Sequence, residues 1–179
     1  MMLKQSKTST AVLTERVQRV QPSATLTISA KAMALKAQGI DIISLSAGEP
    51  DFDTPDHIKE AGIQAIQKGQ TKYTPVDGTP ELKDAIVNKF SQDNNLLYQP
   101  EDILVSSGAK QTCFNLFQAI LEHGKEAVII SPYWVSYPDM VLLANGSPVI
   151  LKTSFANNFQ FNAEDLDSVL TENTHLLML

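Results

Sequence analysis

The feature that most constrains the fold of this chain is an alternation, from Asp102 onward, between short runs of Val, Ile and Leu and longer segments with helical spacing. The short runs are apolar at successive positions, so both faces of each strand need cover, which is typical of a parallel sheet in an α/β protein. The sequence therefore predicts strands at 103–105, 127–130, 148–151 and 176–179, with helices at 109–121, 136–143 and 163–170 between them.

The residues before Asp102 predict helices joined by two long loops. We expect helices at 24–38, 55–69 and 80–93 and one short strand at 42–45. The segment 1–13 lacks apolar periodicity and is expected to form a mobile or partner-dependent arm. The loops at 46–54 and 70–79 are about ten residues long, and loops of this length in a compact domain usually carry function.

Composition and charge exclude several classes of protein. The chain has 14 Lys and Arg against 20 Asp and Glu, a net charge of -6 and no basic cluster, which argues against a nucleic-acid partner. No apolar run approaches the roughly 18 residues of a membrane span, and the N-terminus lacks the apolar segment of a secretory signal. The single cysteine, Cys113, permits no internal disulfide, so a reducing compartment, most simply the cytoplasm, is expected.

The segment 103–112 carries the strongest chemical pattern, because it predicts a strand, a glycine turn and a helix start. Gly108 allows a tight turn, and the free backbone N–H groups of the first helical turn, aided by the helix dipole, can hold a phosphate. A serine-glycine helix start also occurs as a simple cap. Lys110 is a cation at a position that the dipole disfavours, so it either faces an anion or is an ordinary exposed lysine.

Two aromatic residues and the cysteine are further candidates. Trp134 follows the strand at 127–130 and is expected at the carboxyl edge of the sheet, where it can stack on a planar ring or pack in the core. Tyr73 lies in the long loop 70–79 and can reach a ligand, a neighbouring subunit or solvent. Cys113 is expected to be a packing residue and not a nucleophile.

Several common signatures are absent from the sequence. No dinucleotide-binding, P-loop, nucleophile-elbow or zinc-protease motif occurs. His57, His123 and His175 lack the spacing of zinc ligands, so no metal site is expected. The strand at 176–179 is two-faced and apolar but has no following element to cover it, and only Arg16 and Arg19 are arginines, so we expect that the chain is cut short.

Four motifs in order resemble one known family. They are Ser46-Ala-Gly-Glu-Pro-Asp-Phe-Asp-Thr-Pro55, Thr71-Lys-Tyr-Thr-Pro-Val-Asp-Gly-Thr-Pro-Glu-Leu82, Ser107-Gly-Ala-Lys-Gln111 and Ser131-Pro-Tyr-Trp-Val-Ser-Tyr-Pro138. Together they are similar to the N-terminal half of a class I, fold type I aminotransferase that uses pyridoxal 5'-phosphate, most of all the bacterial aspartate aminotransferase subgroup. The resemblance implies an arm and small-domain segment at 1–47 and an incomplete large cofactor-binding domain at 48–179.

The resemblance also implies roles for individual residues. Gly108, Ala109 and Lys110 match the loop that holds the cofactor phosphate, and Trp134 matches the aromatic residue stacked on the pyridine ring. Gly48 matches a main-chain contact near the α-carboxylate of the substrate, and Tyr73 matches a tyrosine that reaches the partner subunit's phosphate in a homodimer. Substrate contacts are thus expected from Gly48, Trp134, Lys110 and Thr25, the last two toward the distal carboxylate.

The family's remaining catalytic groups are implied to lie beyond Leu179. These are the Schiff-base lysine, the aspartate at the pyridinium nitrogen and the arginine for the substrate α-carboxylate, so no catalytic residue is assigned within this chain and the chain alone is expected to be inactive. Gln21 stands where some members of the subgroup have a lysine associated with prephenate, so the resemblance does not extend to that substrate.

The expected reaction is amino-group transfer between L-aspartate and 2-oxoglutarate, an amino acid and a 2-oxo acid. Three alternatives stay open. The first is an aminotransferase for alanine, an aromatic amino acid or kynurenine. The second is a non-catalytic fragment that binds a phosphate ligand, and the third is an unrelated α/β nucleotide-binding module with the same glycine turn.

Overall fold

The computed structural model describes residues 12–179, so most of the arm expected at 1–13 lies outside the described residues. Two compact units are distinguished by their internal contacts. One contains the described residues up to Ala34 together with Cys113–Leu179, and the other is Leu35–Thr112. The domain boundary expected between residues 47 and 48 stays a prediction.

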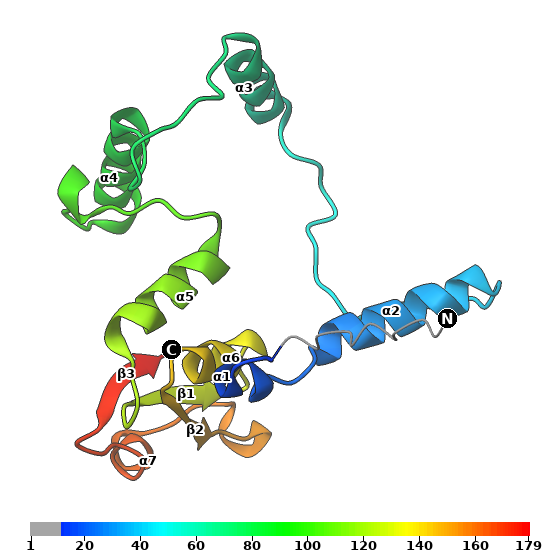
Figure 1. Ribbon diagram of the computed structural model, residues 1–179, viewed down its shortest axis with the longest axis vertical. Coiled ribbons are helices and arrows are strands. Elements are labelled where there is room, and N and C mark those ends of the chain that lie inside the picture. Colours follow the sequence, from blue (N-terminus) through cyan, green and yellow to red (C-terminus); the bar gives the residue numbers. More distant parts are fainter. Residues whose placement is uncertain (1–11) are drawn as a thin grey trace, which may run out of the picture. The chain divides into compact units, whose positions relative to one another are not determined.

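The first unit is built on a parallel sheet of three strands in the order β2-β1-β3 (Figure 1). The strands are β1 (Glu126–Ser131), β2 (Ser147–Lys152) and β3 (Thr174–Met178). Ile129 lies opposite Ile150 in one ladder and opposite Met178 in the other. The three strands expected at 127–130, 148–151 and 176–179 are therefore confirmed, and with them the α/β class.

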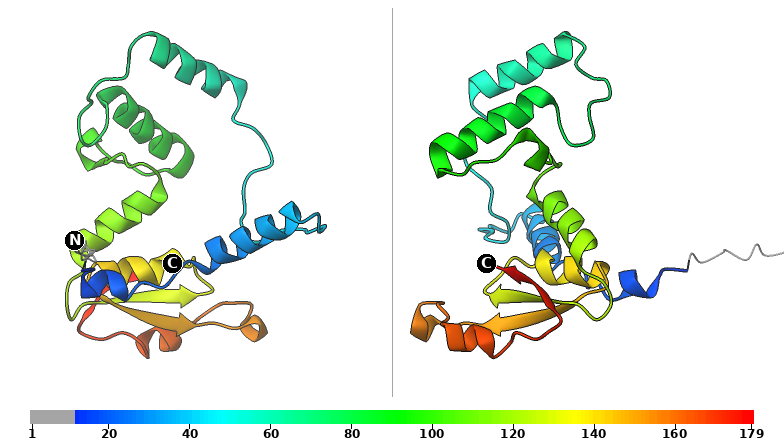
Figure 2. Two further views of the ribbon diagram at one scale, coloured as in Figure 1. Left: turned by 45° about the vertical axis from the view of Figure 1, so that its right-hand side comes forward. Right: turned by 90° about the vertical axis from the view of Figure 1, so that its left-hand side faces the viewer.

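Both faces of β1 are buried, as its unbroken apolar run predicts. Ala127, Val128 and Ile129 are 0%, 0% and 1% exposed. Ala127 and Ile129 point to one face, where they pack against helices α5 (Ala109–Ile120) and α6 (Ser136–Leu143) through Phe117, Leu121, Met140, Val141 and Ala144. Helix α6 lies above the sheet and α7 (Ala163–Asp167) below it in both views of Figure 2.

The turn after α6 explains why the segment 145–146 is Asn-Gly. Asn145 adopts a φ of 62°, and the Gly146 N–H donates to the carbonyl of Val141 at 3.0 Å. A Cβ atom on Gly146 would lie 3.2 Å from Val141 Cγ1 and 3.3 Å from both Leu121 Cβ and the Lys125 carbonyl. Glycine is thus needed for the close approach of this turn to the core.

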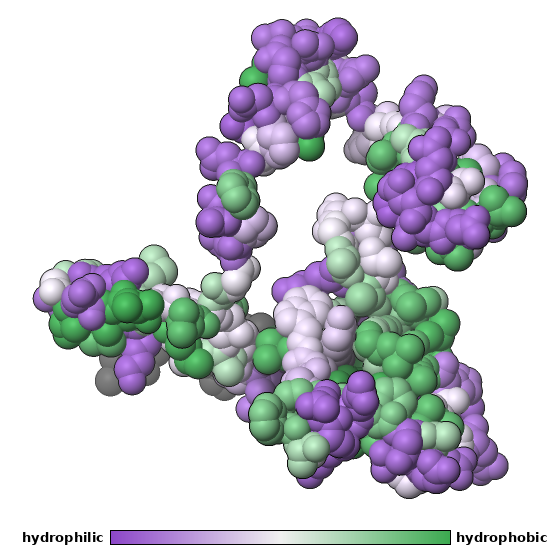
Figure 3. All heavy atoms as spheres, turned by 180° about the vertical axis from the view of Figure 1, so that it is seen from behind, coloured by the Kyte–Doolittle hydropathy of each residue, from purple (hydrophilic) through white to green (hydrophobic). Residues whose placement is uncertain are grey.

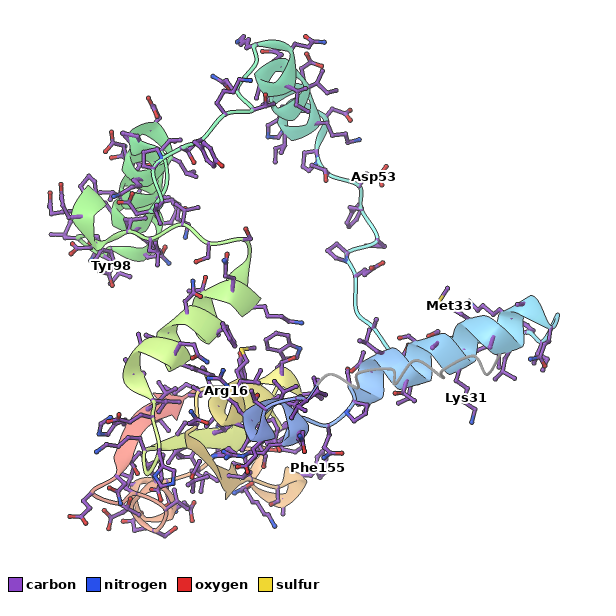
Figure 4. All side chains as sticks on the ribbon, in the orientation of Figure 1. Arg16, Lys31, Met33, Asp53, Tyr98 and Phe155 are labelled. Carbon is purple, nitrogen blue, oxygen red and sulfur yellow. The ribbon has the colours of Figure 1, made fainter. Side chains whose placement is uncertain are left out.

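The second unit contains two helices that the sequence predicts at nearly the same bounds, α3 (Asp56–Gln67) and α4 (Pro80–Asn94). Thr79 caps α4 by accepting a hydrogen bond from the Leu82 N–H at 3.4 Å. The short helix η1 (Pro100–Asp102) follows, and Tyr98, labelled in Figure 4, packs edge-on against Phe90 of α4 with ring centroids 5.6 Å apart. Helix α2 (Ala24–Ala37) is also confirmed.

Two of the expected strands are wrong. The segments 42–45 and 103–105 are not paired in a sheet in the described part of the chain. Ile43 and Leu45 are 88% and 93% exposed, and the Val105 N–H donates to the Asp77 carbonyl at 3.0 Å outside any ladder. An apolar run favours extended backbone, but a strand also needs a neighbouring strand.

The helical ends differ in smaller ways. Helix α7 ends at Asp167 and not at residue 170. Beyond this end the Val169 N–H donates three residues back, to the Leu166 carbonyl, and the Ser168 hydroxyl donates to the Asp165 carbonyl. A short helix, α1 (Glu15–Gln18), and both 3-10 turns, η1 and η2 (Phe155–Asn157), were not expected.

Figure 3 shows hydrophobic atoms gathered over the sheet-bearing unit and hydrophilic atoms over α3. None of the helices formed by residues 12–179 is long and apolar enough to cross a membrane.

Candidate functional site

The glycine turn at residues 106–108 leads directly into α5, as the sequence predicts. Gly108 has a φ of +87°, a conformation that L side chains rarely adopt, and its N–H donates to the Ser106 carbonyl at 2.8 Å. A Cβ atom built on Gly108 would meet no atom within 4 Å, so the space beside the turn is open. The backbone can therefore be approached closely by a ligand.

The start of α5 presents backbone donors to that open space. The Gly108 carbonyl accepts the N–H groups of Gln111 (3.1 Å) and Thr112 (3.3 Å), which closes the first turn of the helix. The N–H of Ala109, the first helical residue, has no carbonyl four residues back within the helix. Together with the helix dipole, this geometry suits a phosphate or carboxylate group.

Two residues of this turn were missed by the sequence reasoning. The Gln111 side-chain oxygen accepts a hydrogen bond from the Ser107 N–H, and the Thr112 hydroxyl donates to the Gly108 carbonyl at 3.4 Å. A glutamine at the third helical position often reaches back to the N-terminal donors in this way, so its spacing from Gly108 was the available signal. The Ser107 N–H therefore already has an oxygen partner within the chain.

Gly48 and Tyr73 lie in the same unit as the glycine turn but on other segments. Gly48 is exposed in the loop 46–54, where no helix or strand forms. The Tyr73 side chain is fully exposed. A shallow pocket of about 600 Å³ is lined by Ala65, Gln70, Lys72, Tyr73, Thr74, Thr79 and Glu81.

Trp134 and Thr25 belong to the sheet-bearing unit. Trp134 follows the carboxyl end of β1 and is 40% exposed, with its ring edge-on to Tyr137 at 5.3 Å and 87°. The Thr153 N–H donates to Ser131 Oγ at 3.3 Å, which ties the segment before Trp134 to the end of β2. Thr25 lies half-buried in the first turn of α2.

The structure thus brings Gly108, Ala109 and Lys110 together as one turn, with Lys110 exposed. Trp134 is neither fully buried nor isolated, and Cys113 packs against the core as expected. The joint arrangement of the two units' residues around one ligand stays a prediction.

One ion pair lies next to the glycine turn. Lys83 of α4 is buried, and its Nζ donates to Oδ2 of Asp77 in the preceding loop. The hydrogen bond from Lys83 is the main cause that holds the pKa of the Asp77 carboxyl below its ordinary range.

Residues 40–179 match the family model described as aminotransferase class I and II. The chain belongs to this aminotransferase family. It is 51% identical over 167 residues to the aspartate/prephenate aminotransferase of Nitrosomonas europaea, covering 93% of this chain and 42% of the relative. It is 49% identical to the aspartate aminotransferase of Bacillus sp. strain YM-2, covering 94% of this chain and 43% of the relative.

Solved aminotransferase structures share the fold. The aspartate aminotransferase of Thermus thermophilus with maleate superposes with a TM-score of 0.89 at 47% identity, over 94% of this chain and 44% of that one. The enzyme of Rhizobium meliloti gives a TM-score of 0.89 at 43% identity, over 94% of this chain and 42% of that one. The chain therefore spans less than half the length of these aminotransferase relatives.

Proposed function

We propose that this chain contributes the cofactor phosphate site and part of the substrate site of an aminotransferase that acts on L-aspartate and 2-oxoglutarate with pyridoxal 5'-phosphate. The turn at Gly108 carries the proposal, because it combines a positive φ, open space and the N-terminus of a twelve-residue helix. These residues fit a phosphate group, and the chain's membership of the aminotransferase family supports the choice of cofactor.

Each residue has a separate task in this proposal. The backbone N–H groups of Ala109 and Lys110 bind the phosphate at the Gly108 turn, whose own N–H is held by the Ser106 carbonyl. The Trp134 ring covers one face of the pyridine ring and excludes water from it. The bound cofactor supplies the electron sink that amino-group transfer requires. No residue of this chain is assigned to the proton transfer.

The substrate assignment rests on Lys110. A cation in the first turn of a helix opposes the dipole, and a carboxylate partner offsets that cost. We assign Lys110 and Thr25 to the distal carboxylate of the substrate and Gly48 to its α-carboxylate. The Thermus thermophilus relative was solved with maleate, a dicarboxylate, which supports a site for such a substrate.

We assign Tyr73 to a contact across a homodimer. Its side chain is fully exposed on a loop, so it is available to a second subunit. A cytoplasmic homodimer is the setting that we propose for the reaction. Relatives carry both the aspartate and the aspartate/prephenate names, but Gln21 gives no reason to include prephenate.

Equilibrium dialysis tests the cofactor assignment. The chain is expected to retain pyridoxal 5'-phosphate more strongly than pyridoxal, which lacks the phosphate, and more strongly than a nucleotide. Preference for the nucleotide would instead favour an unrelated nucleotide-binding module.

The substrate assignment is tested in a fusion protein that joins this chain to the C-terminal portion of the Nitrosomonas europaea relative. Lys110→Ala is expected to raise the KM for aspartate by about tenfold, the scale of one charge-assisted hydrogen bond, and to leave the KM for alanine almost unchanged. Lys68→Ala, at the end of α3, is the control. An equal rise for both amino acids would contradict the assignment.

A further inference from the structure

Lys83 stands out within residues 12–179 because it is the charged side chain that the fold buries. Burial of an ammonium group is costly unless it is paired, and the partner here is Asp77, whose side chain is half exposed. Nothing in the proposed reaction uses either group. The pair therefore needs another explanation.

The neighbours of this pair connect it to the Gly108 turn. The Asp77 carbonyl accepts the Val105 N–H at 3.0 Å. A Cβ atom on Gly78 would lie 2.5 Å from Val105 Cγ2 and 3.6 Å from Lys83 Cγ. The Val105 side chain and the aliphatic part of Lys83 therefore both pack next to Gly78. Only two residues separate Val105 from Gly108.

Backbone hydrogen bonds next to the pair also order the end of the loop that carries Tyr73. The Lys83 N–H donates to the Thr79 carbonyl at 3.0 Å, and Gly78 closes a turn by donating to the Pro75 carbonyl at 3.2 Å. One end of the loop is thereby held on α4, while its Asp77 carbonyl holds the segment before the glycine turn.

We infer that Asp77 and Lys83 are positioning residues, which hold the segment at Val105 so that the Gly108 turn presents its N–H groups to an anion. The pair acts through Val105 and does not touch the ligand itself. This inference rests on the proposed function only for the identity of the anion, the phosphate of pyridoxal 5'-phosphate.

The test compares this pair with a matched exposed pair on the same helix. Lys83→Met, Asp77→Asn and their double variant are made in the full 179-residue chain. The controls are Lys89→Met and Asp93→Asn, which alter a pair 3.9 Å apart whose side chains are 55% and 62% exposed. Lys83→Arg, which keeps the charge, is the rescue variant.

Hydrogen exchange of the amides of Val105, Ser107 and Gly108, each of which donates to an oxygen atom of the chain, is the first measurement. Lys83→Met is expected to speed their exchange by about tenfold, whereas Lys83→Arg and both controls leave it within about twofold. The effects of Lys83→Met and Asp77→Asn on exchange should not add in the double variant, because the two residues act together. Uniformly faster exchange along α4, or no protection of these amides in the parent chain, would overturn the inference.

Ligand affinity is the second measurement and separates the two proposals. Lys83→Met is expected to weaken binding of pyridoxal 5'-phosphate by about tenfold but not that of pyridoxal. If the parent binds the phosphate form and the variant binds it equally well, the positioning role is wrong and the proposed function stands. If the parent does not prefer the phosphate form, the proposed function is wrong, and the exchange data alone decide whether the pair positions the turn.

Discussion

At the scale of single residues, the proposed phosphate site depends on backbone donors and not on side chains. Ala109 is the first residue of α5, a position where proline is compatible with a helix but lacks an N–H. Ala109→Pro is expected to weaken binding of pyridoxal 5'-phosphate by about tenfold, because one hydrogen bond to a charged group is lost. Ala109→Ser keeps the donor and is the control in the same dialysis measurement. Equal affinities of the two variants would show that this N–H does not contact the phosphate.

The lowered pKa of Asp77 predicts that the free energy of unfolding depends on pH through this one carboxyl group. Its pKa in the folded chain is lowered by the hydrogen bond from Lys83, so the folded state favours the charged form. The stabilisation is expected to be fully present above the unfolded pKa of about 3.9 and to be lost as the pH falls through the lowered folded value.

Urea unfolding of the parent and of Asp77→Asn between pH 7 and pH 3 measures this effect. The parent is expected to be the more stable at pH 7, with a difference that shrinks below about pH 4. A difference that is independent of pH would contradict the role given to the Asp77 charge.

At the scale of secondary-structure elements, the sequence predicted those parts whose signals are local. Gly108 and Pro80 mark helix starts, and the apolar runs around Val128 and Val149 mark paired strands. The strands predicted at 42–45 and 103–105 were wrong, because strand pairing depends on distant residues that an apolar run does not specify.

In the candidate site, too, the sequence predicted the features with local signals and missed those that depend on distant residues. The turn from Gly108 to Lys110 is contiguous in sequence, so its geometry followed from a glycine before a helix. The pairing of Lys83 with Asp77 was not foreseen, since exposed lysines are the rule and only tertiary packing buries this one. Gln111 was also missed, although its position at the third helical residue signals a cap.

The turn after α6 offers a stability test at this scale. Gly146→Ala is expected to lower the free energy of unfolding by about 1–3 kcal/mol, because the new methyl group overpacks against Val141, Leu121 and the Lys125 backbone. Gly62→Ala is the matched control, since this helical glycine has open space and alanine favours the helix by about 0.5–1 kcal/mol. Urea unfolding of both variants measures the difference. A stabilising Gly146→Ala would show that the turn relaxes away from the core.

At the scale of the whole molecule, the 179-residue chain is expected to bind pyridoxal 5'-phosphate without transferring amino groups. It spans 42% of the Nitrosomonas europaea relative, and family resemblance places the lysine that bonds the cofactor in the remaining part. Amino-group transfer needs a lysine amine to hold the aldehyde and move the α-proton, and Lys110 is assigned here to the far end of the substrate. Borohydride reduction of the chain with the cofactor, followed by peptide mass mapping, is expected to give no stoichiometric adduct at one lysine. Such an adduct together with turnover of aspartate would show that these residues form a complete active site.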